Sequence, residues 1–306
     1  MVRVVFLGGL GRSGTTLLER ILGELPGVCP LGEVVHLWDR DLRDDERCAC
    51  GTRFSRCEFW QAVGERAFGG WHRVDVSRVL ALRDSVERTR YIPRLAAARL
   101  PDRYREMVDE YVDLYTAVYR SAARVAGADV LVDSSKHSAL AYCLRWSAGL
   151  DLRVVHMVRD SRGVAYSWTK SVARPEASTP DEMTRYPPGR SALLWNAHNA
   201  AFGLLRRKGV PVRRVRYEAL LANPTGTVRE LAGFAGLPDA PLDFLTERSV
   251  RLGPCHSAAG NPMRFAIGEI PLRSDEAWRT HLPPVQRRLV GALTAPLLAM
   301  YGYGRR

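Results

Sequence analysis

Residues 2–25 read VRVVFLGGLGRSGTTLLERILGEL, and this stretch decides the fold of the chain. It opens with a nearly continuous apolar run, residues 2–7, which is typical of a parallel strand covered by helices on both faces. The glycine-rich residues 8–14 follow, where the backbone is free to turn tightly and to approach a ligand. From Thr15 the apolar residues recur at helical spacing, and Pro26 ends that pattern. The stretch therefore predicts a strand, a loop and a helix in succession.

The loop between this strand and this helix is a predicted anion site, because unpaired N–H groups and the positive end of the helix dipole meet there. Its spacing, Gly9, four residues, then Gly14, Thr15 and Thr16, nearly matches the phosphate loop of nucleoside-triphosphate enzymes. That motif needs a Lys directly after its second Gly, but this chain has Thr15 there and carries its cation earlier, as Arg12. The loop is therefore expected to bind a nucleoside triphosphate with magnesium poorly.

The segment RSGTT, residues 12–16, resembles the 5′-phosphosulfate loop of sulfotransferases that use 3′-phosphoadenosine-5′-phosphosulfate. The resemblance implies that this nucleotide is the co-substrate and that the loop holds its 5′-phosphosulfate. The residues that it assigns to this contact are Gly11, Arg12, Ser13, Gly14, Thr15 and Thr16.

A second segment resembles the same family. Residues 158–168, VRDSRGVAYSW, put Arg159 at the end of a predicted strand and Ser167 eight residues later, on the helix that follows. In the family's 3′-phosphate motif that Arg and that Ser bind the 3′-phosphate of the co-substrate. A guanidinium offers a fork of donors to a phosphate, and a Ser hydroxyl adds one more. On its own, the Arg-Asp pair would instead be interpreted as a helix cap.

Two later positions extend the resemblance. Tyr217, in VRYEALLANP, matches the family's Tyr-Glu-x-Leu segment, whose Tyr lies near the nucleotide; the alternative is an aromatic ring that packs at a strand end. Arg264, in the basic loop GNPMRF, is compared with the late loop that closes over the 3′-phosphate in animal cytosolic sulfotransferases. That loop reads Arg-Lys-Gly there, and this chain departs from it.

The family resemblance implies an in-line transfer with a loose transition state, in which charge grows on the leaving phosphate oxygen. Arg12 in the loop is one candidate to stabilise that charge. Lys136 is another, because it closes the polar run DSSK directly after the predicted strand 130–132, at the sheet edge where open α/β folds place ligands. Magnesium is not required by this chemistry, since the sulfuryl group carries a single charge, and no metal is predicted.

Glu33 is the predicted catalytic base. It resembles the Glu of the Gly-Glu pair in tyrosylprotein sulfotransferases and in several bacterial relatives, where that Glu accepts the proton of the acceptor hydroxyl. In the animal cytosolic branch a His does this work, so His36 and His137 remain competing candidates.

The pattern along the chain predicts one α/β domain over residues 1–306, with a parallel sheet of the phosphate-loop type flanked by helices. A helical insert over about residues 40–125 follows the second strand and is a candidate source of acceptor-binding side chains. Residues 171–189 are interpreted either as a lid or as a plain connector. The other predicted strands cover 27–35, 152–158 and 212–217, and the other predicted helices cover 161–170, 191–207, 225–235 and 285–301.

Composition narrows the class of partner. The 306 residues carry a net charge of +12, and nearly all basic residues are Arg, which indicates an anionic ligand or simply a GC-rich genome. The basic residues are dispersed and no nucleic-acid-binding signature occurs, so the sequence predicts no DNA or RNA partner. No apolar run has the length of a membrane span, and the N-terminal run is too short for a signal peptide. The expected location is the cytoplasm.

Three of the six cysteines, Cys48, Cys50 and Cys57, lie close together in the sequence, with His36 and His72 as the nearest histidines. A zinc site is one interpretation. The spacing does not match the usual C-x₂-C pairs of structural zinc sites, so the prediction is free thiols and no metal. A disulfide is disfavoured in a reducing compartment.

These motifs predict a sulfotransferase that moves a sulfuryl group from 3′-phosphoadenosine-5′-phosphosulfate to a hydroxyl of a small-molecule acceptor. A phosphate-loop kinase and a non-catalytic nucleotide-binding protein on the same fold are the alternatives. The sequence distinguishes neither the class of acceptor nor the oligomeric state.

Overall fold

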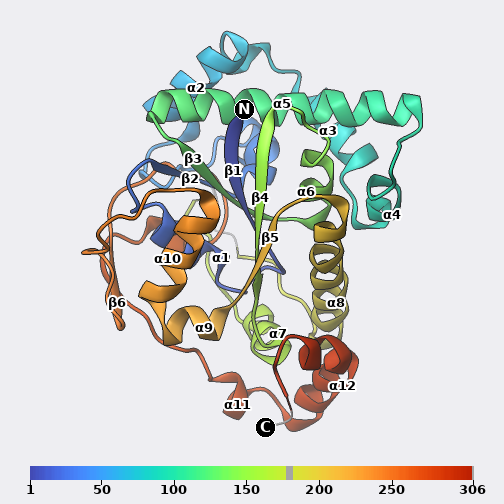
Figure 1. Ribbon diagram of the computed structural model, residues 1–306, viewed down its shortest axis with the longest axis vertical. Coiled ribbons are helices and arrows are strands. Elements are labelled where there is room, and N and C mark those ends of the chain that lie inside the picture. The colour runs from blue at the N-terminus through green and yellow to red at the C-terminus, as the bar shows by residue number, and fades with distance from the viewer. Residues whose placement is uncertain (177–181, 305–306) are drawn as a thin grey trace.

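A five-stranded sheet forms the centre of the protein, whose computed structural model describes residues 1–176 and 182–304 (Figure 1). Every pair of neighbouring strands in this sheet is parallel, and β1 occupies the middle. This arrangement confirms the predicted α/β fold with a parallel sheet. In spatial order the strands are β2 (Val28–Gly32), β3 (Val130–Lys136), β1 (Val2–Gly8), β4 (Leu150–Val158) and β5 (Val212–Arg216).

Helices cover both faces of the sheet, which explains the continuous apolar run of β1. Val4 and Phe6 pack into one hydrophobic cluster, and Val5 and Leu7 pack into the other, as the two-residue period of a strand requires. On the first face lie α5 (Asp102–Ala126), α6 (Ser138–Leu144) and α8 (Pro188–Leu205), and on the second lie α1 (Thr15–Leu22) and α10 (Pro224–Ala235).

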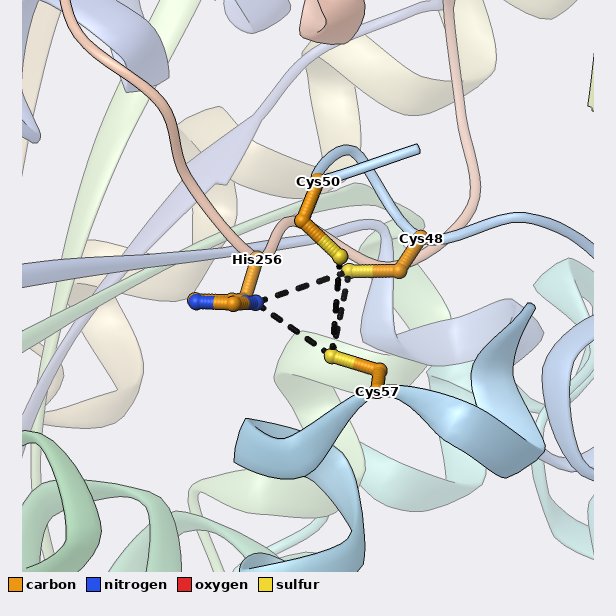
Figure 2. A group of neighbouring side chains, drawn as sticks. All are labelled: Cys48, Cys50, Cys57 and His256. Atoms are coloured by element: carbon orange, nitrogen blue, oxygen red, sulfur yellow. Dashed lines mark hydrogen bonds between the residues drawn. The ribbon is translucent and has the colours of Figure 1, made fainter. Parts of the chain in front are cut away.

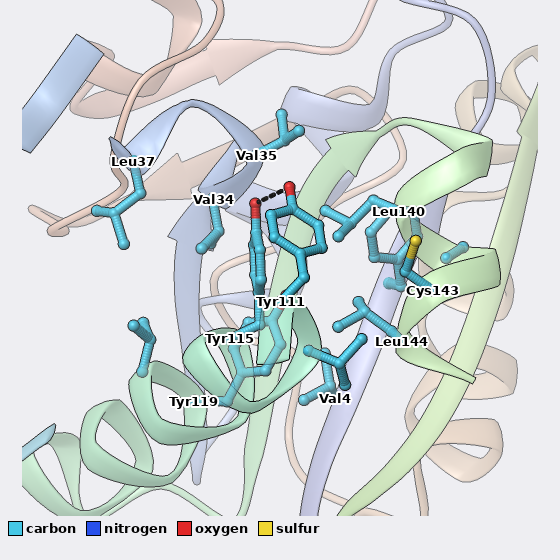
Figure 3. Close-up of a cluster of buried hydrophobic side chains, with 14 of the residues drawn as sticks. Val4, Val34, Val35, Leu37, Tyr111, Tyr115, Tyr119, Leu140, Cys143 and Leu144 are labelled. Carbon is cyan, nitrogen blue, oxygen red and sulfur yellow. Dashed lines mark hydrogen bonds between the residues drawn. The ribbon is translucent and has the colours of Figure 1, made fainter. Parts of the chain in front are cut away.

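Helix α5 fastens the insert to the sheet through a row of buried tyrosines (Figure 3). Tyr111, Tyr115 and Tyr119 are four residues apart and therefore lie on one face of the helix. The Tyr111 and Tyr115 hydroxyls are 3.1 Å apart. The Tyr119 hydroxyl donates to Asp133 in β3 at 2.5 Å, and Asp133 in turn accepts from the Ser135 backbone N–H. The insert thus supports the end of the strand that carries Lys136.

The insert begins earlier than the predicted residue 40, directly after β2. Its first turns are a 3₁₀ segment (Val34–His36) and a π-helical segment (Leu37–Arg43), and α2 (Glu58–Phe68), α3 (Val76–Val86) and α4 (Ile92–Leu95) precede α5. Within the described part of the chain, no helix combines the length and the apolar character that a membrane crossing needs.

The C-terminal half differs in two places from the prediction. An antiparallel pair, β6 (Ser249–Leu252) and β7 (Gly268–Pro271), escaped prediction because each strand is only four residues long. Tyr217 opens a short helix, α9 (Tyr217–Ala222), and does not belong to β5. Part of the predicted lid, residues 177–181, lies outside the described residues. The remaining helices are α7 (Ser161–Thr169), α11 (Trp278–His281) and α12 (Pro284–Met300).

One buried carboxylate joins four parts of the fold. Glu19, in α1, is 1% exposed. It accepts hydrogen bonds from the Gly32 backbone N–H (2.7 Å), from Ser134 Oγ in β3 (2.6 Å) and from Ser257 Oγ (2.8 Å). Burial raises the pKa of this carboxyl despite its three donors. Glu19 therefore fixes the helix after the glycine-rich loop to the carboxyl ends of β2 and β3.

We expect Glu19→Ala to lower the free energy of unfolding by about 3 kcal/mol, because it leaves three buried donors without their acceptor. Urea unfolding followed by circular dichroism measures this loss. Glu19→Gln is the matched control: its amide keeps the shape and most of the hydrogen bonds, and it should cost much less. Equal losses for the two variants would contradict the role assigned to this carboxylate.

Candidate active site

The glycine-rich loop runs from the end of β1 to the first turn of α1, as predicted. Gly14 has φ of +90°, and a Cβ atom at this position would lie 2.5 Å from the ring of Tyr217. Only glycine meets both demands without strain. Arg12 also adopts a left-handed backbone, with φ of +73°, which is uncommon for a residue with a side chain. The loop conformation is therefore imposed by tertiary packing.

Polar atoms of this loop are buried without partners. Within residues 1–176 and 182–304, Arg12 Nε, Arg12 Nη2 and Thr15 Oγ1 have no hydrogen-bond acceptor or donor. The Arg12 guanidinium lies 5.4 Å from the centre of the Trp168 ring. Leaving such groups unsatisfied is costly, and an oxyanion at the N-terminus of α1 would satisfy them. The residues present therefore fit a phosphate or sulfate group.

Arg159 lies behind the same loop, at the end of β4. Its Nη1 donates to the Arg12 carbonyl at 3.1 Å, and its guanidinium stacks on Tyr217 at 4.7 Å from the ring centre. The neighbouring helix α7 also contacts the loop, because Trp168 Nε1 donates to the Gly11 carbonyl at 3.0 Å. Ser167 precedes Trp168 on this helix. The structure thus gathers the two predicted phosphate motifs and Tyr217 around one loop.

Two charged residues near Arg159 were absent from the sequence prediction. Asp275 accepts from Arg159 Nη2 through its carbonyl at 3.1 Å, and its carboxylate lies 3.4 Å from the same guanidinium. Lys170 lies 3.2 Å from the Asp275 carboxylate. A lone Asp in a polar loop carries no motif, so nothing in the sequence singled it out. Arg159 is therefore already paired with an anion in this structure.

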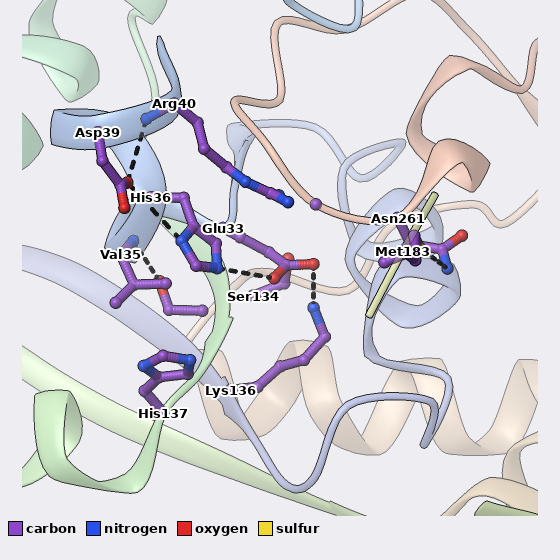
Figure 4. A network of polar contacts seen from close by, with 12 residues as sticks. Glu33, Val35, His36, Asp39, Arg40, Ser134, Lys136, His137, Met183 and Asn261 are labelled. Carbon is purple, nitrogen blue, oxygen red and sulfur yellow. Dashed lines mark hydrogen bonds and ion pairs between the residues drawn. The ribbon is translucent and has the colours of Figure 1, made fainter. Parts of the chain in front are cut away.

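A second polar group lies at the ends of β2 and β3 (Figure 4). Glu33 directly follows β2, and Lys136 ends β3 with a left-handed φ of +67°. The two side chains form a nearly buried ion pair. His36 lies beside them, with its Nε2 at 3.9 Å from the Glu33 carboxylate, and its ring centre is 5.8 Å from that of His137. All the predicted candidates for the base therefore lie together.

The candidate bases differ in the direction and cause of their pKa shifts. Burial by itself would raise the pKa of Glu33, but the Lys136 charge, joined by His36 when its ring is protonated at low pH, outweighs burial and lowers that pKa to about 2. Burial lowers the pKa of His36, so its imidazole is neutral at pH 7. Burial also lowers the pKa of Arg12, and Glu33 opposes that shift. Arg12 and Glu33 therefore interact electrostatically.

The Glu33–Lys136 pair should be visible in the pH dependence of stability. The pKa of Glu33 is about 2 when folded and about 4.3 in an unfolded chain. Because the folded value is depressed, this stabilisation is fully present above about pH 4.3 and is lost as the pH falls toward 2. We expect Glu33→Gln to cost about 3 kcal/mol at pH 7, and the difference from the parent to shrink as unfolding is measured from pH 5 down to pH 3. A constant difference would contradict the pairing.

Arg264 belongs to a different environment from the other predicted residues. It is 1% exposed, and its guanidinium donates to the backbone carbonyls of Gly260 (2.8 Å) and Arg47 (2.9 Å). Its own carbonyl accepts from Arg20. These contacts join the insert to the segment between β6 and β7, and they leave Arg264 little freedom to reach a ligand.

Cavities occur at both ends of the sheet. A cavity of about 230 Å³ is lined by Arg159, Tyr217 and Asp275. A larger one, of about 1340 Å³, lies where β1 and β4 begin and is lined by Val2 and Leu150. We place the candidate site at the first end, because the unpartnered donors and the Glu33–Lys136 pair lie at the carboxyl ends of the strands.

Comparison with known proteins identifies the family of the chain. A family model described as the sulfotransferase family matches residues 4–241. The chain belongs to the sulfotransferase family, which confirms the family predicted from the sequence. No curated protein matches the chain.

Two solved structures have a similar fold. The sulfotransferase domain of the Synechococcus PCC 7002 olefin synthase is 18% identical, with 96% of this chain and 94% of that chain covered and a TM-score of 0.50. The sulfotransferase domain from the curacin biosynthetic pathway is 15% identical, with 97% and 98% covered and a TM-score of 0.51. At these identities the likeness shows the fold alone.

Proposed function

We propose that this protein transfers a sulfuryl group from 3′-phosphoadenosine-5′-phosphosulfate to a hydroxyl of a small-molecule acceptor. Membership of the sulfotransferase family supports the reaction class. One observation supports this choice of sulfuryl donor: buried polar atoms of Arg12 and Thr15 at the N-terminus of α1 have no partner among the described residues. A bound oxyanion would supply that partner.

In this proposal the loop residues 11–16 hold the 5′-phosphosulfate, while Arg159 and Ser167 hold the 3′-phosphate. Tyr217 lies between them, since it contacts both Gly14 and the Arg159 guanidinium. Asp275 must yield its contact with Arg159 when the 3′-phosphate arrives, because both anions use the same donors. We assign Arg264 a structural role, given its bonds to backbone carbonyls.

Glu33 is the proposed base, and its ion-pair partner Lys136 controls the pKa of its carboxylate. A carboxylate whose pKa is about 2 accepts a proton poorly. When the donor binds, the phosphosulfate offers Lys136 a second anionic partner, and Lys136 then stabilises the charge that grows on the leaving phosphate oxygen. Release from Lys136 raises the pKa of Glu33 and makes it a better base. His36, neutral at pH 7, and His137 are the alternatives for this step, and no metal is required.

The first test of the proposal is nucleotide binding. We expect adenosine 3′,5′-bisphosphate, the product of the donor, to raise the melting temperature, because a ligand of the folded state stabilises that state by mass action. ATP with magnesium should do much less, since the loop lacks the lysine that a triphosphate needs. Differential scanning fluorimetry measures both. Stronger stabilisation by ATP with magnesium, followed by phosphate transfer, would favour a kinase.

Arg159→Ala and Ser167→Ala serve as controls for this measurement. The Arg159 variant should lose most of the shift caused by the bisphosphate but little of that caused by adenosine 5′-phosphosulfate, which lacks the 3′-phosphate. The Ser167 variant should act in the same direction but more weakly. Parent-like bisphosphate binding by both variants would remove these residues from the 3′-phosphate site.

The second test separates Arg12 from Glu33 by single-turnover transfer of radiolabelled sulfate. Arg12→Ala should slow transfer by roughly 10²- to 10³-fold, the loss that follows deletion of one preorganised oxyanion donor. Glu33→Gln should retain bisphosphate binding, because the ligand replaces the carboxylate as the partner of Lys136. Its transfer to weakly acidic alcohols should fall by about 10²- to 10⁴-fold, whereas an acidic phenol, already partly ionised, should lose less. Equal losses for both kinds of acceptor would point to His36 or His137.

A further inference from the structure

Four side chains that can bind a metal converge away from the candidate active site (Figure 2). Cys48 and Cys50 lie in the turn before α2, Cys57 directly precedes that helix, and His256 comes from the segment between β6 and β7, 199 residues after Cys57. One atom of each, three Sγ atoms and an imidazole nitrogen, lies within 4.8 Å of all the others.

The spacings of these atoms match a tetrahedral zinc site. Bond lengths of about 2.3 Å to sulfur and about 2.0–2.1 Å to nitrogen place two sulfur ligands about 3.8 Å apart, and sulfur and nitrogen about 3.6 Å apart. Cys57 Sγ lies 3.7 Å from Cys48 Sγ and 3.8 Å from Cys50 Sγ. His256 Nδ1 lies 3.3 Å from Cys57 Sγ and 4.0 Å from Cys48 Sγ. These sulfurs are well beyond the roughly 2.05 Å of a disulfide, and all three thiols are free.

Hydrogen bonds and ring stacking around the group hold the four side chains in place. Gly51 turns the chain with φ of +90°, and its N–H donates to the Cys48 carbonyl at 2.9 Å. On the other side, the buried Trp60 donates its Nε1–H to the His256 carbonyl at 2.8 Å, and the Phe59 ring stacks on the imidazole at 5.1 Å between centres. The ligands thus come from two parts of the chain that other contacts already join.

We propose that Cys48, Cys50, Cys57 and His256 bind one zinc ion in a structural site. Three soft thiolates and an imidazole are a ligand set that suits zinc. Four protein ligands fill a tetrahedral shell and leave no open position for substrate, so the ion stabilises the fold and does not take part in transfer. The site therefore adds to the proposed sulfotransferase activity and does not depend on it.

This proposal departs from the sequence prediction of free thiols without a metal. The spacing C-x-C-x₆-C matches no common zinc motif, and the fourth ligand is remote in the sequence. The histidines nearest in sequence do not belong to the group. His36 instead approaches Glu33 and Asp39, at 3.9 and 3.8 Å.

The proposed zinc site lies where the insert meets the segment that packs beside β2. The segment that carries His256 continues beside β2: the Ala258 N–H donates to the Leu31 carbonyl at 2.8 Å, and the Glu33 N–H donates to the Ala258 carbonyl at 3.2 Å. From the insert, the Ala49 N–H donates to the Ser257 carbonyl at 3.1 Å. A zinc ion here would cross-link the insert to the segment that holds the backbone of Glu33.

The experiment uses the full chain, purified without a metal-affinity tag. We expect mass spectrometry of the metal content to find one zinc ion per chain, and a chelator to lower the melting temperature by several degrees as it removes the ion, since metal binding contributes to folding stability. Cobalt added in place of zinc should give the visible absorption bands of a tetrahedral site with thiolate ligands.

Variants locate the ion. Cys50→Ser and His256→Gln should each bind far less than one zinc ion per chain, and their melting temperatures should no longer respond to the chelator. Cys255→Ser is the matched control: it lies next to His256 but outside the group, and it should keep the full zinc content. If a ligand variant fails to fold, the cobalt spectrum and thiol titration of the parent decide, because three thiols should become reactive only after chelation.

Three results would overturn the proposal. The first is a parent protein that holds no zinc as purified and whose melting temperature does not respond to added zinc or cobalt. The second is a full zinc content in both ligand variants. The third is a disulfide within the group in protein purified under reducing conditions. None of these results would affect the bisphosphate test, so failure of the zinc site and failure of the proposed function remain distinguishable.

Discussion

The hydrogen bonds of the buried Glu19 carboxylate are the interaction on which the rest of the candidate active site depends. A helix that follows a glycine-rich loop can supply an anion site by itself, but an in-line transfer also needs groups from neighbouring strands at fixed positions. Glu19 provides that fixation, because it binds the backbone before Glu33, the strand that carries Lys136 and the segment after His256. Glu19 itself need not contact either the sulfuryl donor or the acceptor molecule.

Local signals predicted the parts of this structure that are local. The strand, loop and helix of residues 2–25 are set by hydrophobic periodicity and glycine placement, so β1, the loop and α1 were predicted close to their bounds. Glu33 was singled out because its Gly-Glu pair resembles that of other sulfotransferases, and Lys136 because it follows a strand at the sheet edge where open α/β folds place ligands. The strand order and the pairing of these two residues required the tertiary structure.

The residues that the sequence missed share a physical property: each acts through a partner far away in the chain. Glu19 resembles any charged residue on an amphipathic helix until its three donors are known. Asp275 is unremarkable until it lies against Arg159, 116 residues earlier. Arg264, which a basic loop predicted as a ligand contact, has a guanidinium that donates to the protein's own backbone carbonyls, and these partners are also far away in the sequence or invisible to a motif. Single-sequence patterns carry no information on such pairs.

Because His256 is far from the three cysteines in the sequence, it is synthesised well after them. His256 follows Cys57 by 199 residues, and a ribosome that adds 5–20 residues per second needs about 10–40 s to cover them. For that interval the thiols exist in a growing chain that lacks the imidazole and the strands flanking it. The contact requires His256, which comes four residues after the end of β6, so the N-terminal insert cannot acquire this tether until most of the chain has been made.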